Sequence, residues 1–292
     1  MNKIEQKDGK LIVPHLEFHA SHMCNFSCQS CSHFTNHKHN KIYSIDELKG
    51  YQERWADKIV SKSLAILGGE PLLNKDIINI LYMTAEVWDM KHVKQFELVT
   101  NGMYLHKFPD LPKVLRDIGC SLALTIHSNE SGYIKRINKI LKLIQDWHYE
   151  YDINYYTYPN HKVWNQKYLG YGDYMKPFKT DYSEAWDYCL SGQNCFQLFR
   201  GKIYKCCLLA YLNLQKEKYD LSEEWDYYLT YEPLRSNASN EEIISFFNMG
   251  AEPYCSMCPG KIKTKFTKNH PEKPKDYYEN NVEDSALPKK LF

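Results

Sequence analysis

Residues 16–31 read LEFHASHMCNFSCQSC, a short strand pattern that leads directly into three closely spaced cysteines. Cys24, Cys28 and Cys31 have a Cys-x3-Cys-x2-Cys spacing on the loop expected after this strand. Three thiolates so near one another can converge on one metal centre, and iron–sulfur clusters are held by such thiolates. Three ligands for four irons leave one iron open, and an open iron can bind a substrate or a cofactor.

A structural zinc ion is the alternative for the same three cysteines. Zinc in a structural site takes four ligands in a closed tetrahedron, so a fourth donor is needed. His19, His22 and His33 flank the cysteines, and each could supply it. The cysteine spacing alone therefore leaves both a cluster and a zinc site open.

Outward from this loop, strand patterns alternate with helix patterns as far as residue 158. The helix patterns carry apolar residues at three- and four-residue intervals, and Ser44 with Glu47 forms a capping-box signature. This alternation predicts right-handed βαβ units and therefore an α/β fold with a parallel sheet. The predicted strands are residues 16–20, 63–67, 96–100, 121–126 and 153–158, and the predicted helices begin after Ser44 and Asn74 or cover residues 111–118 and 134–147.

A second motif, GGEP at residues 68–71, follows the second predicted strand. Two glycines let a ligand approach the backbone closely, and a glutamate there can bind an ammonium group. With the cysteine loop one βαβ unit upstream, the chain resembles the radical SAM superfamily over roughly residues 14–160. That resemblance implies a partial (β/α)6 barrel.

The resemblance also implies the ligands of the site. Cys24, Cys28 and Cys31 would hold a [4Fe–4S] cluster whose open iron binds the amino and carboxylate groups of S-adenosylmethionine. The methionyl amino group would contact Gly68, Gly69 and Glu70. Polar residues near the ends of the third and fourth strands could contact the ribose, although ordinary strand-end hydrogen bonds explain them equally well; these candidates are Thr100, Asn101, Thr125, His127 and Ser128.

A second cysteine group lies between residues 189 and 258, where a Cys-x11-Gly-x4-Cys arrangement precedes a Cys-x2-Cys pair. This spacing resembles SPASM domains and their shortened twitch relatives, which bind auxiliary [4Fe–4S] clusters, and the cysteine count favours one such cluster. If residues 200–201 form a hairpin turn, Cys195 lies opposite Cys206 and can replace another ligand. A four-cysteine zinc site is the alternative. The candidate ligands are Cys189, Cys195, Cys206, Cys255 and Cys258.

Composition limits the remaining possibilities. The 292 residues include 37 Lys and Arg against 36 Asp and Glu, a net charge of +1 that argues against a nucleic-acid-binding surface. No apolar run approaches the roughly 18 residues of a membrane span, and the first ten residues have no apolar signal core. We therefore expect a cytoplasmic protein without a membrane or nucleic-acid partner. Ten cysteines in a reducing compartment point to metal or redox chemistry.

The domains expected are a barrel over residues 14–180, an auxiliary-cluster domain over 181–262 and an extended tail over 263–292. By resemblance, the protein reductively cleaves S-adenosylmethionine to a 5′-deoxyadenosyl radical, which abstracts hydrogen from a substrate, with a reductant protein such as flavodoxin or ferredoxin as partner. A small polar, sugar-like substrate is favoured, since only 23 residues precede Cys24, too few for a separate peptide-binding module. The reaction would be a dehydrogenation or an epimerisation. A peptide-modifying enzyme and a zinc-stabilised binding protein are the alternatives.

Overall fold

The computed structural model describes residues 4–159, 166–189 and 195–260. At its centre is a seven-stranded sheet with the strand order β10-β9-β3-β5-β6-β7-β8. Five of these strands are parallel neighbours and match the five predicted: β3 (Leu16–Ser21), β5 (Ser63–Gly68), β6 (Gln95–Thr100), β7 (Ser121–Thr125) and β8 (Tyr155–Tyr158). The predicted α/β class is confirmed, and among the described residues the sheet is open, as a partial barrel requires.

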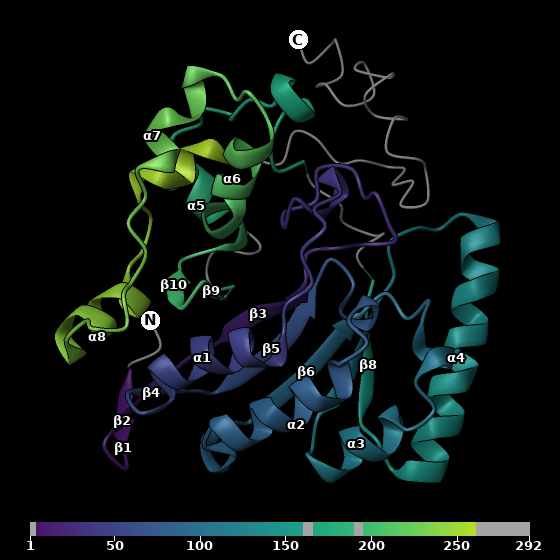
Figure 1. Cartoon of the computed structure of the whole chain (residues 1–292). Helices are drawn as coiled ribbons and strands as arrows, with labels where there is room; N and C mark the ends of the chain where they lie inside the picture. The colour runs from purple at the N-terminus through teal and green to yellow at the C-terminus, as the bar shows by residue number, and fades with distance from the viewer. Residues whose placement is uncertain (1–3, 160–165, 190–194, 261–292) are drawn as a thin grey trace.

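Four helices connect these strands: α1 (Ile45–Ala56), α2 (Ile77–Val87), α3 (Leu111–Asp117) and α4 (Ser131–Tyr151). Figure 1 shows α1, α2 and α3 along one face of the sheet, with α4 at the far side beyond β8. The capping box predicted at Ser44 and Glu47 is present. The cap predicted at Asn74 is wrong, because α2 begins after Asp76. The Asn74 amide instead donates to the carbonyl oxygens of Ala20 and Tyr43, which fixes the turn against β3.

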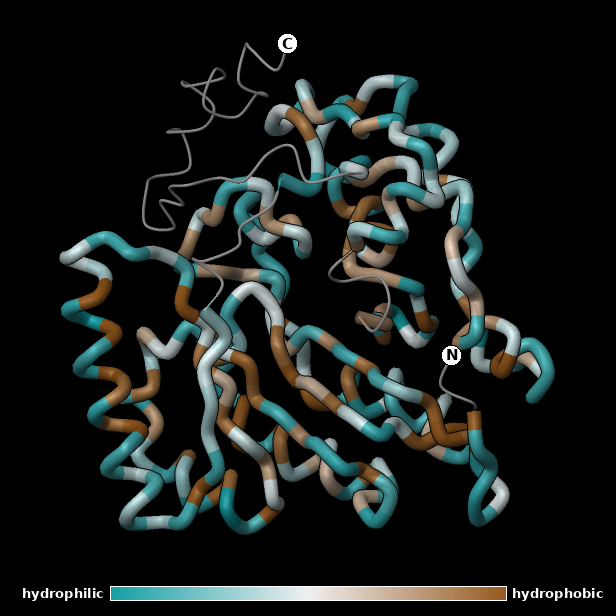
Figure 2. Tube along the Cα trace, turned by 180° about the vertical axis from the view of Figure 1, so that it is seen from behind, coloured by the Kyte–Doolittle hydropathy of each residue, from teal (hydrophilic) through white to brown (hydrophobic). Residues whose placement is uncertain are grey.

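Alternating side chains give the central strands two different faces. On β5, Leu64 and Ile66 are fully buried in the hydrophobic core, whereas Ser63, Ala65 and Leu67 face a cavity. On β6, Phe96 and Leu98 are buried, whereas residues 95, 97 and 99 line the same cavity. Figure 2 shows this sheet from behind and the alternation of hydrophobic and hydrophilic positions along α4. The core therefore lies between sheet and helices, and the opposite face is free to form a site.

The C-terminal region adds an edge to this sheet. The predicted hairpin consists of β9 (Gln197–Phe199) and β10 (Lys202–Tyr204), with Phe199 opposite Lys202 as expected. Arg200 and Gly201 both have positive φ angles, as a two-residue hairpin turn of type I′ requires. Strand β9 pairs in parallel with β3. Sheet pairing thus runs across the boundary expected at residue 180.

The remaining helices are α5 (Tyr182–Asp187), α6 (Cys207–Lys218), α7 (Asp226–Leu229) and α8 (Asn240–Asn248). Helix α8 begins with the predicted capping box of Ser239 and Glu242. Figure 1 shows α5, α6 and α7 together above the sheet, while α8 lies near β2. Short 3-10 helices are η1 (Thr35–His37), η2 (Pro71–Leu73), η3 (Met90–His92), η4 (Leu105–Lys107), η6 (Gly172–Tyr174), η7 (Glu223–Trp225) and η8 (Pro253–Met257).

Several parts of the fold were not predicted, among them the short helices α5 and α7. A small sheet combines β1 (Glu5–Lys7), β2 (Lys10–Val13) and β4 (Ile59–Ser61), strands of three or four residues that are too short to show a period. Helix α6 was missed because most of its first half, CLLAYL, is buried, so polar and apolar residues do not alternate around it. The tail expected over residues 263–292 lies outside the described residues. No helix in the described part of the chain has the length and apolar character needed to cross a membrane.

Candidate functional site

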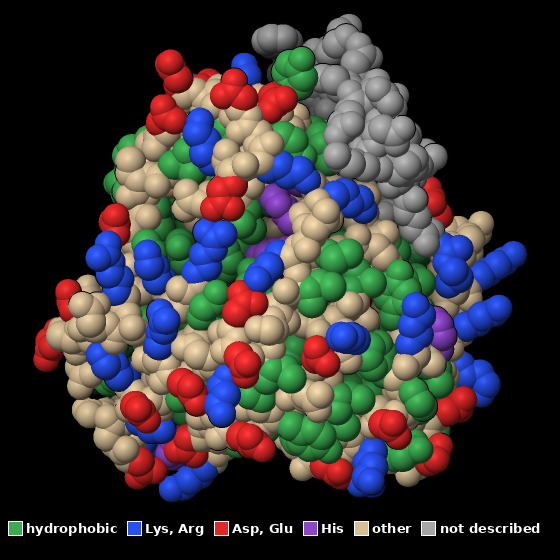
Figure 3. Space-filling model, viewed as in Figure 1, with side chains coloured by type: hydrophobic (Ala, Val, Ile, Leu, Met, Phe, Trp, Pro, Cys, Tyr) green, Lys and Arg blue, Asp and Glu red, His purple; other side chains and the backbone are tan. Residues whose placement is uncertain are grey.

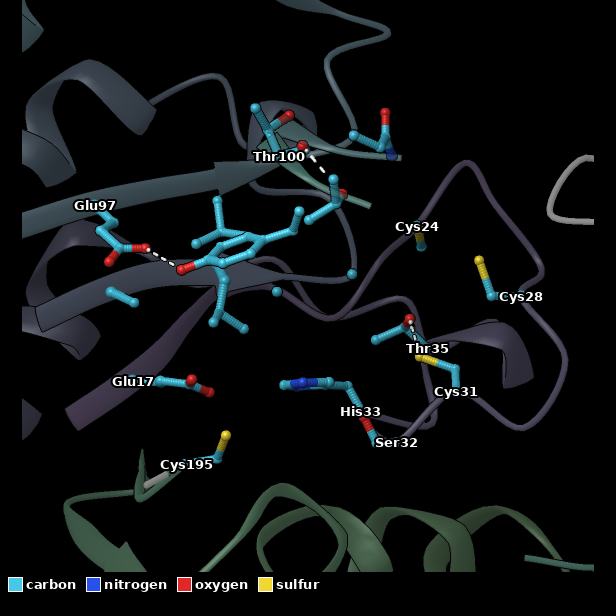
Figure 4. Close-up of a pocket in the computed structure, with 18 of the residues that line it drawn as sticks. Glu17, Cys24, Cys28, Cys31, Ser32, His33, Thr35, Glu97, Thr100 and Cys195 are labelled. Atoms are coloured by element: carbon cyan, nitrogen blue, oxygen red, sulfur yellow. Dashed lines mark hydrogen bonds between the residues drawn. The ribbon is translucent and has the colours of Figure 1, made fainter. Parts of the chain in front are cut away.

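A cavity of about 780 Å³ lies against the inner face of the sheet, beneath the cysteine loop. Figure 4 shows the three cysteine sulfurs at one end, Glu17 and Glu97 at the other, and His33 between them. Its volume falls within the roughly 300–1,000 Å³ typical of small-molecule sites. The candidate residues that line this cavity are Cys24, Cys28, Cys31, Gly68, Gly69, Thr100, Asn101, Thr125, His127 and Cys195.

The three cysteines of the loop share one end of this cavity. The backbone N–H of Phe26 donates to Cys24 Sγ at 3.3 Å, and Thr35 Oγ1 lies 3.4 Å from Cys31 Sγ. Burial raises the pKa of Cys24 to about 12, so a bound cation is needed to hold it as a thiolate. Hydrogen-bond donors beside the sulfurs are the surroundings that iron–sulfur clusters use to tune their potential. These residues therefore fit a [4Fe–4S] cluster.

The two glycines of GGEP hold the cysteine loop in place. A Cβ atom on Gly69 would lie 2.3 Å from the carbonyl oxygen of Met23 and 2.9 Å from Cβ of Cys24. A Cβ on Gly68 would lie 2.2 Å from the carbonyl oxygen of Ser21. The N–H groups of Gly69 and Glu70 donate to the carbonyls of Ser21 and Met23. The glycines thus permit close packing between the end of β5 and the loop, in addition to the close approach of a ligand that their sequence suggests.

Glu70 is fully buried and does not line the cavity. Its carboxylate accepts hydrogen bonds from the N–H of Leu72 at 3.0 Å, the hydroxyl of Thr100 at 2.6 Å and the N–H of Asn101 at 2.9 Å. Burial raises the pKa of Glu70 to about 7 despite these donors. The side chain therefore joins the end of β5 to the end of β6, directly behind the glycines.

The other polar candidates form a connected group at the strand ends. Thr125 donates its hydroxyl to the carbonyl of Thr100 and lies 2.8 Å from His127 Nε2, while His127 Nδ1 lies 3.7 Å from Cys28 Sγ. Asn101 donates to the side chain of Asn25 within the cysteine loop. Ser128 lies outside the cavity lining and accepts from the N–H of Glu130 at the start of α4. Four of the five ribose candidates thus face the cavity.

The three histidines considered as zinc ligands contact one another instead. His19 Nδ1 lies 2.9 Å from His22 Nδ1, and His19 Nε2 lies 2.7 Å from His33 Nδ1. Burial lowers the pKa of each ring, which keeps the three imidazoles neutral. Within the described ranges, no three Cys, His, Asp or Glu side chains converge closely enough to hold a single metal ion.

The far end of the cavity was missed in the sequence because it consists of isolated residues on separate strands. Glu17 and Glu97 both pair in register with Ala65, so they lie in one layer with a small side chain between them. Glu17 contacts His15 at 2.9 Å and accepts from the amide of Gln197. Glu97 accepts from the hydroxyl of Tyr158 at 3.3 Å and from the amide of Gln95. One signal was available in the sequence: on strands expected to be buried, polar residues such as Glu17 and Glu97 alternate with apolar ones.

The two carboxylates differ in their electrostatics. Burial alone would raise the pKa of Glu17, but the hydrogen bond and charge of His15 bring it below its usual value. Burial raises the pKa of Glu97, and the neighbouring charge of Glu17 adds to this rise. Lys62 also lines this end of the cavity and is paired with Glu5 at 3.5 Å. This end therefore favours a neutral or cationic ligand with several hydroxyl or amino groups.

The second cysteine group surrounds a separate small cavity of about 30 Å³. Cys189, Cys206, Cys207 and Cys258 line it, and Cys255 lies one turn before Cys258 in η8. Cys206 immediately precedes α6, and burial raises its pKa well above the usual value. Cys195 instead lines the large cavity near Glu17. Three of the four ligands that the twitch spacing favours, Cys189, Cys206 and Cys258, thus line this cavity, together with Cys207.

The chain between residues 155 and 188 is rich in tyrosine, and these side chains lie in different places. Tyr168 and Tyr171 are buried under the cysteine loop, where their hydroxyls donate to the side chain and the carbonyl of Asn36. Tyr174 is 74% exposed. Tyr168 and Tyr171 support the loop, whereas Tyr158 lines the cavity, as Phe26 also does; Trp164 lies outside the described residues.

The structure combines an open, parallel α/β sheet with three cysteines on a loop at its carboxyl edge, beside a large cavity. Residues 19–147 match the family model described as the Radical SAM superfamily. The chain therefore contains a radical SAM domain, and this family implies a [4Fe–4S] cluster and S-adenosylmethionine.

Curated relatives match parts of the chain. The chain is 26% identical over 151 residues to GTP 3′,8-cyclase of Listeria monocytogenes serotype 4b, covering 49% of this chain and 43% of the relative. It is 30% identical over 104 residues to the probable GTP 3′,8-cyclase of Methanocaldococcus jannaschii, covering 36% and 33%. The chain thus spans less than half the length of these relatives.

Two solved structures are similar to parts of the chain at low identity. One is anSMEcpe with bound AdoMet, at 19% identity and a TM-score of 0.39, covering 50% of this chain and 43% of that one. The other is Streptococcus suis SuiB bound to S-adenosylmethionine, at 15% identity and a TM-score of 0.32, covering 75% and 68%.

Proposed function

We propose that this protein cleaves S-adenosylmethionine reductively and abstracts hydrogen from a small, polar, sugar-like substrate, which is then dehydrogenated or epimerised. One observation carries the proposal: a single cavity is lined at one end by Cys24, Cys28 and Cys31 and at the other by Glu17 and Glu97. Cofactor and substrate can therefore lie side by side in the same enclosed space.

A [4Fe–4S] cluster with one open iron would supply the electron that cleaves the sulfonium carbon–sulfur bond of bound S-adenosylmethionine. The chain would position that cofactor through Gly68 and Gly69, which face the cavity beside Cys24. Thr100, Asn101, Thr125 and His127 would lie along the ribose. Glu70 would act from behind by fixing Asn101, and the cavity would keep other hydrogen donors away from the radical.

The substrate class follows from the far end of the cavity. Glu17 and Glu97 each retain acceptor capacity beyond the donors that orient them, and hydroxyl or ammonium groups can use it. A nucleoside triphosphate, the substrate named in the GTP 3′,8-cyclase relatives, would bring its negative charge against these two carboxylates. We therefore favour a polyhydroxylated substrate without phosphate groups, and keep peptide modification as the second candidate.

A second, four-cysteine cluster belongs to this proposal. The small cavity lined by Cys189, Cys206 and Cys258 would hold it, and Cys255 would complete the ligands. Four thiolates would leave it no open iron, so its role would be the transfer of electrons. A small electron-carrier protein such as flavodoxin or ferredoxin would be the external reductant.

The test is anaerobic turnover of the reconstituted protein with S-adenosylmethionine, dithionite and a panel of sugars, amino sugars and cyclitols in deuterated water. A ketone product indicates dehydrogenation, and a retained alcohol with one solvent deuterium on carbon indicates epimerisation. Glu97→Gln should keep basal formation of 5′-deoxyadenosine but lose its stimulation by the substrate. Turnover with peptides alone would refute the substrate class.

A further inference from the structure

A basic surface lies beside the cysteine loop, in a chain whose net charge is only +1. Lys216 and Lys218 project from the exposed end of α6, and Arg200 and Lys202 lie beside them on the β9–β10 hairpin. Lys218 also contacts the carbonyl oxygens of His37 and Lys38, which brings the loop after the cysteines into the same surface. We call this surface the α6 basic patch; it consists of Lys38, Lys41, Arg200, Lys202, Lys216 and Lys218.

Few acids compensate these six cations. Glu47 pairs with Lys41 at 2.7 Å, and Glu217 pairs with Arg200 at 3.0 Å. His39 lies within the patch, and burial, together with the charge of Lys218, lowers its pKa to about 4, so it stays neutral. These six cations and two acids together carry a net charge of +4, while Asp173 and Asp220 lie beyond the end of α6. In Figure 3 Lys and Arg side chains, with some Asp and Glu among them, surround histidine in the upper middle of the molecule, where Figure 1 places α6 beside the loop after β3.

The patch has a direct connection to the proposed cluster. Lys38 Nζ lies 3.1 Å from the carbonyl oxygen of Phe26 and 3.5 Å from that of Cys24. One side chain of the patch thus packs on the back of the loop whose front faces the cavity. Charge at the end of α6 alone would serve to complement the helix dipole. The patch also draws its cations from two other elements, so that role does not account for it.

We propose that the α6 basic patch is the docking surface for an acidic one-electron carrier protein, which delivers the electron that the proposed function requires. A cationic surface steers an acidic partner and raises its association rate, and transient redox complexes need only a small interface. A carrier docked there would lie beside the Cys24 loop, on which Lys38 packs. The electron passes from the reduced carrier to the cluster, so one carrier molecule is oxidised for each S-adenosylmethionine cleaved.

The test compares two reductants on charge-reversal variants. Lys202→Glu/Lys216→Glu removes part of the patch without touching the cavity, and Lys135→Glu/Lys139→Glu makes the same change on the exposed face of α4. With a reduced bacterial flavodoxin of net negative charge, the patch variant should need about tenfold more flavodoxin for half-maximal formation of 5′-deoxyadenosine. Wild type and the α4 variant should be alike. With dithionite, all three should react at the same rate.

Binding of the oxidised flavodoxin, measured by titration calorimetry at low and high salt, gives a readout independent of turnover. Wild type and the α4 variant should bind more tightly at low salt, and the patch variant should lose this dependence. Equal flavodoxin dependence in all three proteins would overturn the docking surface. If the patch variant also forms 5′-deoxyadenosine more slowly than wild type with dithionite, the docking proposal is overturned too, because the two lysines would then affect the reaction rather than carrier binding. Wild type that is inactive with dithionite would instead refute the proposed function.

Discussion

At the scale of single residues, Glu70 and Glu97 are both buried carboxylates, yet their partners give them different roles. Glu70 accepts from the rigid backbone N–H groups of Leu72 and Asn101, whereas the donors to Glu97 are the side chains of Gln95 and Tyr158. If Gln replaced Glu70, its NH2 group would face a backbone N–H, and two donors would oppose each other. If Gln replaced Glu97, the side chains of Gln95 and Tyr158 could rotate to accept from the new NH2 group.

Glu70→Gln should therefore lower the free energy of unfolding by about 1–3 kcal/mol, the cost of an unsatisfied buried donor. Glu97→Gln, the matched control, should cost less. Urea unfolding under anaerobic conditions measures both. Equal losses of unfolding free energy in the two variants would show that the backbone donors around Glu70 do not add to its stabilisation.

The raised pKa of Glu70 also predicts a pH dependence. Its pKa rises from 4.5 to about 7 on folding, so the protonated form is favoured in the fold. The stabilisation is complete below about pH 4.5 and is lost as the pH rises through 7. Between pH 5 and pH 8, wild type should therefore lose stability relative to Glu70→Gln, by at most about 3 kcal/mol for a shift of this size. A constant difference between the two proteins would contradict the raised pKa.

Gly69 can be tested in the same way. Gly69→Ala should displace the cysteine loop, since the new Cβ would meet the carbonyl of Met23 and the side chain of Cys24. The variant should bind substantially less iron after reconstitution. Gly50→Ala is the control, because its Cβ would meet nothing within 4 Å and alanine favours the helix. Full iron content in Gly69→Ala would show that the loop can move aside.

At the scale of elements, α6 brings part of the second cysteine group together. Cys206 immediately precedes this helix and Cys207 is its first residue, and both line the small cavity with Cys189 and Cys258. The sequence left Cys189 and Cys195 as alternatives because both precede the hairpin by a few residues. Cys189 lines the small cavity, whereas Cys195 lines the large one. Cys195 nevertheless stays near the second group, since burial and then the charges of its neighbours, Cys189 and Cys206 among them, raise its pKa.

Iron content tests this assignment. Reconstituted wild type should hold about eight irons, because two four-iron clusters are proposed. The Cys24/Cys28/Cys31→Ala variant should keep about half of them and form no 5′-deoxyadenosine. Cys206→Ala should also lose about half, whereas Cys195→Ala should keep all. Zinc in place of the second set of irons would refute the auxiliary cluster.

At the scale of the whole molecule, the sequence predicts the parallel sheet and its helices well, because long alternating segments carry a clear period. It locates Cys24 to Cys31 and Gly68 to Glu70 through their spacing. It does not locate Glu17 and Glu97, which become neighbours only when β3, β5 and β6 pair in register. Residues that meet only through strand register leave no local pattern.

The domain boundary expected at residue 180 can be tested by unfolding. Strand β9 pairs with β3, and the indole N–H of Trp55 on α1 donates to the carbonyl of Gly201 in the hairpin turn. The barrel and the C-terminal region should therefore unfold in one cooperative transition. Hydrogen exchange should show equal protection in β3 and β9 near the denaturation midpoint. Two separate transitions would indicate independent domains.

The amide of Gln197 on β9 reaches Glu17 on β3, residues separated by most of the length of the chain. During translation, β3 through β8 are synthesised before β9. Until β9 follows, one edge of β3 has no partner strand and the cavity wall around Glu17 is incomplete. The hairpin that closes this wall is translated only after all of those strands. Nascent chains should therefore need shielding of that edge by a chaperone, and the wall around Glu17 should be complete only once β9 has paired with β3.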